Sequence, residues 1–272
     1  MTDNASLLLP LAALLAAGAG AGFAGGLFGI GGGFVVVPAL VLILPLLGTA
    51  PDQLTHVAVG TSLATIIFTS LRSVRSHARR KSVDAAVLKS WALWVVLGTF
   101  AATLVADRFT SSTLALVFGI GVLGFAVHFL LPRIHDRQVL DAMPEGAAKI
   151  GLAGGLGMVS ALLGIGGGTI TTMVMTLSGA PIHRAIGTAS GMGAIIALPA
   201  AAGFAIIGLD TPGMPWGSLG YVNLPAALAI VSVSVLFAPL GVAAAHRLSP
   251  GLLRRVFALY LIVVGITMIA KS

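Results

Sequence analysis

The chain has 272 residues, of which 57% are hydrophobic and only 8% are charged, and its mean hydropathy is +1.07. A soluble domain carries about 25% charged residues, so this composition excludes a water-soluble fold and indicates a membrane protein. The lack of cysteine excludes disulfides, thiolate catalysis and cysteine-ligated metals. The net charge of +7 does not indicate nucleic acid, because the basic residues fall in short loops between hydrophobic runs.

Ten hydrophobic segments follow one another, and their length without period-two alternation predicts helices. In the first half they lie at about 5–24, 33–48, 56–72, 84–106 and 112–132. In the second half they lie at about 148–164, 168–180, 183–208, 222–245 and 251–270. The first segment lacks a basic flank, so we expect a retained membrane helix rather than a cleaved signal peptide. The fold class that follows is an all-α polytopic membrane protein.

Two motifs occur once in each half of the chain. The pentapeptide Gly-Ile-Gly-Gly-Gly stands at 29–33 and again at 164–168. Downstream, a His, a Gly and a Thr recur at a constant spacing, since 56 to 183, 60 to 187 and 61 to 188 each differ by 127. Repeats of this kind predict two copies of one structural unit. We assign repeat one to 1–132, a cytoplasmic linker to 133–148 and repeat two to 149–272.

The charge of the loops predicts how the two repeats lie in the membrane. Five basic residues crowd 72–81, which places that loop in the cytoplasm, whereas the matching loop at 209–221 has no Lys or Arg and is expected outside. Because equivalent loops carry opposite charge, we predict inverted-topology repeats, each a glycine-broken helical hairpin plus three transmembrane helices. Both termini are then outside the cell.

The glycine pentapeptides are expected to break their helices, since each Gly costs about 1 kcal/mol relative to Ala inside a helix. Irregular backbone at membrane depth is tolerated only where it is buried in protein or lines a polar cavity. The second arm of each hairpin starts directly after the motif, at Phe34 and at Thr169, so a helix N terminus with free N–H groups faces each turn. This predicts an anion site. The alternative is close helix packing, which the glycines within 18–26 also suit.

The His-Gly-Thr segments also have two interpretations. Thr61 and Thr188 are in register and each places a hydroxyl group in an apolar helix. These hydroxyls are expected to hydrogen-bond either to a ligand or to a backbone carbonyl of their own helix. His56 and His183 stand at the first residues of their predicted helices, at opposite faces of the membrane. Each is interpreted either as a solvated or helix-capping residue or as part of a titratable gate.

All eight acidic residues fall at or near predicted loops. A cation pump with a carboxylate relay would bury one of them, so the sequence disfavours a cation substrate. We expect no cofactor, no metal site and no catalytic residue. The expected partners are a small anion and the lipid bilayer, with a homo-oligomer left open.

At the paired Gly-Ile-Gly-Gly-Gly and Gly-Thr motifs, and over nearly its whole length, the chain resembles the TauE/SafE sulfite exporter family of bacterial inner-membrane anion transporters. The resemblance implies transport of sulfite, thiosulfate, sulfoacetate or related sulfonates. The candidate substrate-binding residues, including Thr169 at the start of the second arm, are Gly31, Gly32, Gly33, Thr61, Ser62, Gly166, Gly167, Gly168, Thr169, Thr188 and Ser190. Because Ala189 separates Thr188 from Ser190, the two half-sites are expected to be unequal.

Three functions are compatible with these features. The first is a secondary transporter for small sulfur-containing anions, and the second is a passive anion channel through the two glycine turns. The third is an intramembrane enzyme or a lipid-handling protein, which is weaker because the sequence has no His-Glu-x-x-His pair and no cysteine.

Overall fold

The computed structural model describes residues 4–130, 140, 142–245, 247 and 250–272. Most of the predicted linker at 133–148 therefore lies outside the described residues. The helices of the first half are α1 (Asn4–Phe28), α2 (Gly33–Ile43), α3 (Leu54–Arg79), α4 (Ala85–Ala106) and α5 (Ser111–Leu130). Those of the second half are α6 (Gly146–Leu162), α7 (Gly168–Leu177), α8 (Ile182–Ile207), α9 (Leu224–Ala245) and α10 (Pro250–Ala270).

Short elements connect some of these helices. Two 3₁₀ turns, η1 (Leu44–Leu47) and η2 (Pro51–Gln53), link α2 to α3. The loop after α8 contains a two-residue antiparallel pair, β1 (Ser218–Leu219) and β2 (Val222–Asn223), which the sequence did not predict. All ten predicted helical segments are confirmed. The main difference is α3, which was expected to end near residue 72 and continues to Arg79.

The extension of α3 has a simple cause. No Gly or Pro interrupts residues 61–79, and basic side chains in a last turn are favoured by the helix dipole. The basic cluster predicted as a loop is therefore largely the C-terminal end of a helix.

Six helices in the described part of the chain are long and apolar enough to cross a membrane: α1, α3, α4, α5, α8 and α9. The helices that follow the glycine motifs are much shorter, since α2 has 11 residues and α7 has 10. At 1.5 Å per residue they reach about 15 Å, half of the roughly 30 Å hydrocarbon layer. Neither of these two helices spans the bilayer by itself.

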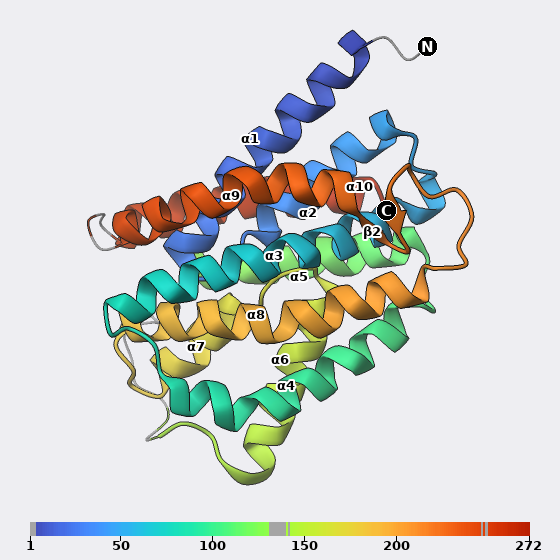
Figure 1. The fold of residues 1–272 in the computed structure, drawn as a ribbon. Helices are drawn as coiled ribbons and strands as arrows, with labels where there is room; N and C mark the ends of the chain where they lie inside the picture. The colour runs from blue at the N-terminus through green and yellow to red at the C-terminus, as the bar shows by residue number, and fades with distance from the viewer. Residues whose placement is uncertain (1–3, 131–139, 141, 246, 248–249) are drawn as a thin grey trace.

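Helices α3 and α8 lie side by side at the centre of the molecule and run in opposite directions (Figure 1). A methyl group on Gly187, near the start of α8, would lie 3.2 Å from the Cβ of His77 near the end of α3. At the other end, a methyl on Gly60 would lie 3.1 Å from the Cβ of Phe204. Two equivalent helices thus form an antiparallel pair.

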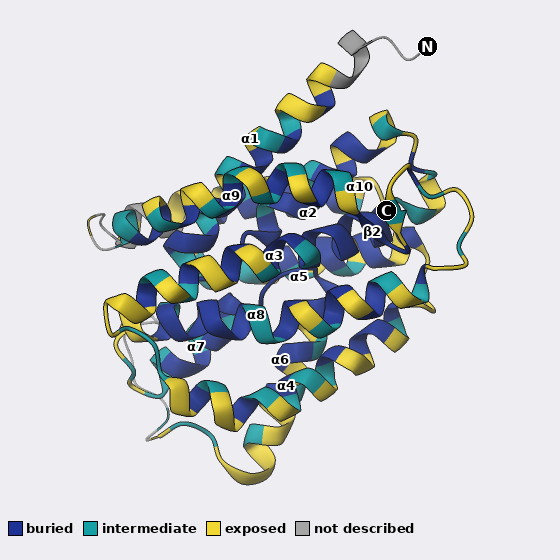
Figure 2. Cartoon of the chain, viewed as in Figure 1, coloured by how far each residue is buried: buried dark blue, intermediate teal, exposed yellow. Residues whose placement is uncertain are grey.

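The outer helices exchange partners between the halves. Helix α1 of the first half packs on α9 of the second half. The helices at the equivalent positions, α6 and α4, pack on each other in the same way. Helices α5 and α10, the last helix of each half, also pack on each other. Figure 2 shows buried residues along the inner faces of α3 and α8 and exposed ones on the outer faces of α4 and α9. Those outer faces carry large apolar side chains such as Leu104 and Leu228, as a lipid-facing surface requires.

The glycines of α1 allow the close packing on α9. Methyl groups on Gly18, Gly22 and Gly26 would all meet the α9 backbone, at Ile230, Ser234 and Ala238. The packing interpretation of residues 18–26 is therefore confirmed.

Candidate anion site at the two glycine breaks

The two glycine breaks touch each other. The N–H of Gly166 donates to the carbonyl of Ile30 across 3.3 Å. A methyl on Gly33 would overlap the carbonyl oxygen of Gly164, and a methyl on Gly168 would overlap that of Gly29. Gly33 corresponds to Gly168 and Gly29 corresponds to Gly164, so the two contacts are reciprocal. Any side chain at position 33 or 168 would overlap the backbone of the other break, so both positions require glycine.

Each break ends at the exposed N terminus of a helix. The residues before α2 and α7 are Gly32 and Gly167, with φ of 87° and 63°, a left-handed conformation that favours glycine. No side chain within the described residues caps either helix. The first N–H groups of a helix have no partner inside it and point out of its N terminus, so those of α2 and α7 are directed at the contact between the breaks.

The contact lies halfway along the central helix pair. A methyl on Gly166 would lie 3.2 Å from Ile66 of α3 and 3.2 Å from the Cα of Gly193 of α8. Ile66 and Gly193 are close to the midpoints of their helices. The irregular backbone of the second break therefore lies midway along the central helix pair and is buried inside the protein, the only setting in which such backbone is tolerated within a membrane.

Three buried hydroxyl groups near the breaks have no hydrogen-bond partner among the described residues: those of Ser70, Ser160 and Thr169. The Ser70 oxygen lies 3.1 Å from a methyl position on Gly31, and the Ser160 oxygen lies 3.0 Å from one on Gly167. Thr169 is in the first turn of α7. Buried polar groups are normally paired, so three unpaired donors beside two helix N termini indicate a site for an acceptor.

Ser70 and Ser160 were not among the predicted residues. The sequence of α3 shows a polar stripe at every fourth position, formed by Thr61, Thr65, Thr69 and Ser73, but Ser70 stands one residue after Thr69 and outside this stripe. All four are buried. The hydroxyl of Thr69 lies 3.0 Å from that of Ser234 on α9.

The serines of the His-Gly-Thr segments differ between the halves. Ser62 donates to the carbonyl of Gly164 across 2.9 Å and so touches the second break. Ser190 instead lies 3.0 Å from the hydroxyl of Ser73 on α3. Their partners are unlike, in line with the interruption of the second motif by Ala189.

Thr61 and Thr188 occupy equivalent positions that hold helix caps. The Thr61 hydroxyl accepts from the N–H of Asn223, the residue before α9, at 2.9 Å. The Thr188 hydroxyl accepts from the N–H of Asp84, the residue before α4, at 2.8 Å. Each threonine thus ties a central helix to the start of a helix from the other half.

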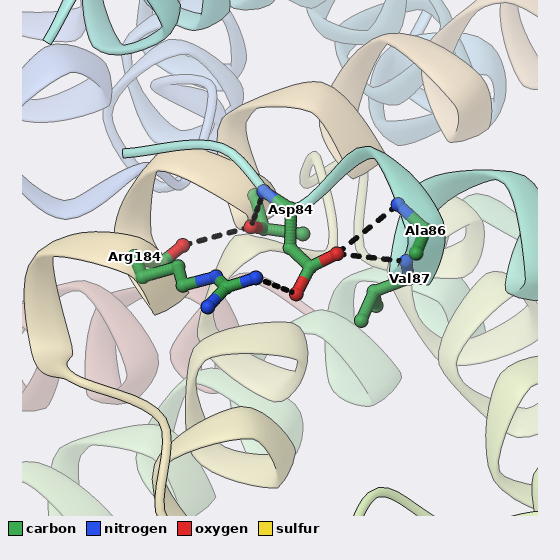
Figure 3. Close-up of polar contacts among 5 residues, drawn as sticks. Asp84, Ala86, Val87 and Arg184 are labelled. Carbon is green, nitrogen blue, oxygen red and sulfur yellow. Dashed lines mark hydrogen bonds and ion pairs between the residues drawn. The ribbon is translucent and has the colours of Figure 1, made fainter. Parts of the chain in front are cut away.

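Only one of these two caps carries an ion pair (Figure 3). Asp84 accepts from the N–H groups of Ala86 and Val87 at 3.1 and 3.2 Å and pairs with Arg184 at 2.7 Å. At the other end Asn223 accepts from Ala226 at 3.0 Å, and the residue in register with Arg184 is Val57. The two ends of the helix pair are therefore chemically different.

The two histidines are also in unlike surroundings. His56 is 3% exposed, its Nε2 lies 3.1 Å from the carbonyl of Ala106, and its ring lies 4.9 Å from that of Tyr221. His183 is exposed in the first turn of α8. Their shared register in the sequence does not give them a shared environment.

Charged groups do not enter this region. Within the described residues no Asp, Glu, Lys or Arg side chain is buried, and no cluster of His, Asp and Glu there could hold a metal ion. The donors available near the breaks are backbone N–H groups and hydroxyls, which suit an anion.

Comparison with known proteins identifies the family. Residues 14–268 match the sequence model of the sulfite exporter TauE/SafE family. A probable membrane transporter protein of Haemophilus influenzae is 35% identical over 94% of this chain and 97% of its own length. One from Methanocaldococcus jannaschii is 31% identical over 97% of this chain and 96% of its own. No solved structure matches the chain. With this family match over nearly its whole length and six helices long enough to span a bilayer, the chain is a multi-pass membrane protein that belongs to the TauE/SafE sulfite exporter family.

Proposed function

We propose that the protein is a secondary transporter of small sulfur-containing anions such as sulfite, thiosulfate, sulfoacetate or related sulfonates. The observation that carries this proposal is the contact between the two glycine breaks, where two uncapped helix N termini meet unpaired buried hydroxyls. The family name and the names of the relatives support a transporter rather than an enzyme.

The substrate site consists of the two breaks and the side chains beside them. From the predicted set it includes Gly31, Gly32, Gly33, Ser62, Gly166, Gly167, Gly168 and Thr169. Ser70 and Ser160 join them because their unpaired hydroxyls lie next to Gly31 and Gly167. Thr61, Thr188 and Ser190 support the helices around the site, since their hydroxyls bond to residues outside the breaks, whereas Ser62 donates to the carbonyl of Gly164 in the second break.

The halves are proposed to be inverted in the bacterial inner membrane, with both termini outside the cell. The antiparallel pairing of α3 with α8 supports this orientation, as does the basic end of α3 opposite the loop after α8, which lacks Lys and Arg. The short helices α2 and α7 favour hairpins that enter from opposite faces and meet at mid-depth.

The test is flux of labelled sulfite in liposomes that contain the purified protein. A transporter predicts saturable uptake that is accelerated by unlabelled sulfite on the opposite side of the membrane. Uptake that does not saturate and shows no such counterflow would instead establish the passive channel. Absence of flux for every anion of a panel containing sulfite, thiosulfate and sulfoacetate would overturn both.

A further inference from the structure

Polar side chains lead along α3 from the glycine breaks to the basic end of that helix. Ser70, Ser73 and His77 are three and four residues apart, so they lie on one face of α3. Each of them is at most 1% exposed. At 1.5 Å per residue they cover about 10 Å of the helix, and His77 stands two residues before Arg79, where α3 ends. Buried polar groups therefore connect the break contact with one end of the central helix pair.

The same three side chains lie against α8. The Ser70 oxygen lies 2.5 Å from a methyl position on Gly193, and His77 lies against the first turns of α8. The hydroxyls of Ser73 and Ser190 are 3.0 Å apart, and Ser190 can also donate to a carbonyl of its own helix. Hydroxyl groups rotate between such partners, so they can turn to donate to an anion. We call Ser70, Ser73, His77 and Ser190 the polar seam.

The other half of the helix pair is apolar at the equivalent positions. An offset of 127 residues relates α3 to α8, and it pairs the polar seam with Ala197, Ala200, Phe204 and Leu63, in that order. All four of these residues are fully buried. Because polar and ionisable groups are expensive inside a membrane, they mark functional positions there. Three hydroxyls and an imidazole at one end, matched by apolar side chains at the other, indicate a function confined to the basic end of α3.

The polar seam is covered by the first hairpin. The Nε2 atom of His77 lies 3.4 Å from the carbonyl oxygen of Gly26, near the end of α1. The Ser70 oxygen lies 3.1 Å from a methyl position on Gly31 of the first break. The seam is therefore closed in this structure, and the end of α1 together with the first break must move away to open it.

One hydrogen bond distinguishes the two breaks in this respect. Ser62 of α3 donates to the carbonyl of Gly164 and so fastens the second break to the central pair. The residue in register with Ser62 is Ala189, which has no hydroxyl. The second break is thus held to the helix pair by a bond whose counterpart the first break cannot form, and the first break covers the polar seam.

We propose that the polar seam is the path along which the anion moves between the glycine breaks and the basic end of α3. The hydroxyls of Ser73 and Ser190 and the imidazole of His77 are its donors outside the binding site. The path opens when the last turn of α1 and the first break separate from α3 and α8. The inference rests on the proposed function for the identity of the anion and adds the route by which it reaches or leaves the site.

Single cysteines test the path, because the chain has no cysteine of its own. The anionic, membrane-impermeant thiol reagent 2-sulfonatoethyl methanethiosulfonate is applied to membrane vesicles from each side in turn. Ser73→Cys and Ser190→Cys should react from the side on which Arg80→Cys reacts, since Arg80 follows α3. Ala200→Cys and Leu63→Cys are the matched controls from the apolar half and should react only after denaturation. Equal labelling of all four variants, or labelling of none before denaturation, would overturn the path.

A second test separates a donor on the path from a hydroxyl that only joins two helices. Ser190→Ala should slow sulfite flux in liposomes about tenfold or more, the value of a hydrogen bond to a charged group. The rise of the unfolding midpoint with sulfite should remain, because a ligand bound at the intact breaks still stabilises the folded state. A loss of that rise would place Ser190 in the binding site and overturn its role on the path.

Ser234→Ala is the matched control for Ser190→Ala. Ser234 of α9 lies 3.0 Å from the hydroxyl of Thr69 on α3 and also lies near a carbonyl of its own helix, as Ser190 does, but it is outside the polar seam. Its flux should equal that of the wild-type protein. Equal flux in the two variants would overturn the path, since a purely structural hydroxyl pair predicts equal effects.

The outcomes distinguish this inference from the proposed function. If the wild-type protein carries sulfite while Ser73→Cys and Ser190→Cys stay unlabelled, transport stands and the path fails. If the two cysteines are labelled from the basic end but the wild-type protein carries neither sulfite, thiosulfate nor sulfoacetate, the hydrophilic path stands and the transporter fails.

Discussion

A single tyrosine compensates for a proline in the helix after the first break. Pro38 lies inside α2 and has no N–H, so the carbonyl of Phe34, four residues earlier, loses its helical partner. The hydroxyl of Tyr260 on α10 donates to that carbonyl at 3.2 Å. A buried carbonyl inside a helix is therefore satisfied by a side chain from the other half of the chain.

We expect Tyr260→Phe to lower the free energy of unfolding by about 1 kcal/mol, the usual net value of one hydrogen bond. In a Pro38→Ala background the new N–H at position 38 can donate to Phe34, so the same change should cost less. Thermal unfolding of the two single variants and the double variant measures this coupling. Equal costs of Tyr260→Phe in the two backgrounds would contradict the compensation.

The threonines in register were predicted from the sequence as substrate ligands, and the structure gives them another role to test. Thr61→Val and Thr188→Val leave the N–H of Asn223 or Asp84 without its acceptor, which costs about 1–3 kcal/mol for a buried group. We expect both variants to have lower unfolding midpoints, with Thr61→Ser and Thr188→Ser restoring them. A variant that weakens substrate binding at unchanged stability would favour the ligand role instead.

At the scale of the helical elements, the reciprocal glycine contact holds the two broken hairpins together. Gly33→Ala and Gly168→Ala introduce a methyl group into the backbone of the opposite break, at Gly164 and Gly29. Nothing there is flexible enough to move aside, since the overlapping atoms are carbonyl oxygens. The two breaks can accept these changes only by moving apart.

We therefore expect Gly33→Ala and Gly168→Ala to abolish sulfite flux and to lower the unfolding midpoint. Gly155→Ala in α6 is the control, because a methyl there meets nothing within 4 Å and Ala stabilises a helix by about 1 kcal/mol relative to Gly. Wild-type flux and stability in the two break variants would show that the contact between the breaks is not needed.

At the scale of the whole molecule, the proposed inversion of the halves predicts that equivalent loops lie on opposite sides of the membrane. Arg80 follows α3 and Asp210 lies in the loop after the equivalent helix α8, and both are exposed. In Figure 1 these loops lie at opposite ends of the molecule. The chain has no cysteine of its own, so single cysteines can be introduced without background.

In intact cells, a membrane-impermeant thiol reagent should label the Asp210→Cys variant from outside. It should label the Arg80→Cys variant only after the cells are permeabilised. Labelling is detected as a mass shift of the purified protein. If both positions react from the same side, the inverted arrangement is wrong.

Much of the helical architecture could be predicted because lipid forces the backbone into helices and because glycine marks their breaks. The contact between the breaks could be anticipated only from the repetition of the pentapeptide. The roles of the individual Ser and Thr hydroxyl groups could not be predicted from the sequence in this way. Thr61 and Thr169 are both threonines in apolar helices, and only the three-dimensional neighbours distinguish a cap acceptor from an unpaired donor. Ser160 lies in the last turn of α6, just before the second pentapeptide, but its register equivalent in the first half is Gly25, so no repeated hydroxyl marks it.

The central claim is that an anion binds where the two glycine breaks meet. Its most direct test is an experimental structure of the protein with selenite, a selenium analogue of sulfite that can be located by anomalous scattering. We predict a selenium position within hydrogen-bonding reach of the first N–H groups of α7 and of the hydroxyls of Ser160 and Thr169. A selenium position elsewhere, such as beside the exposed Arg184 at the end of the helix pair, with none at the breaks, would contradict the account.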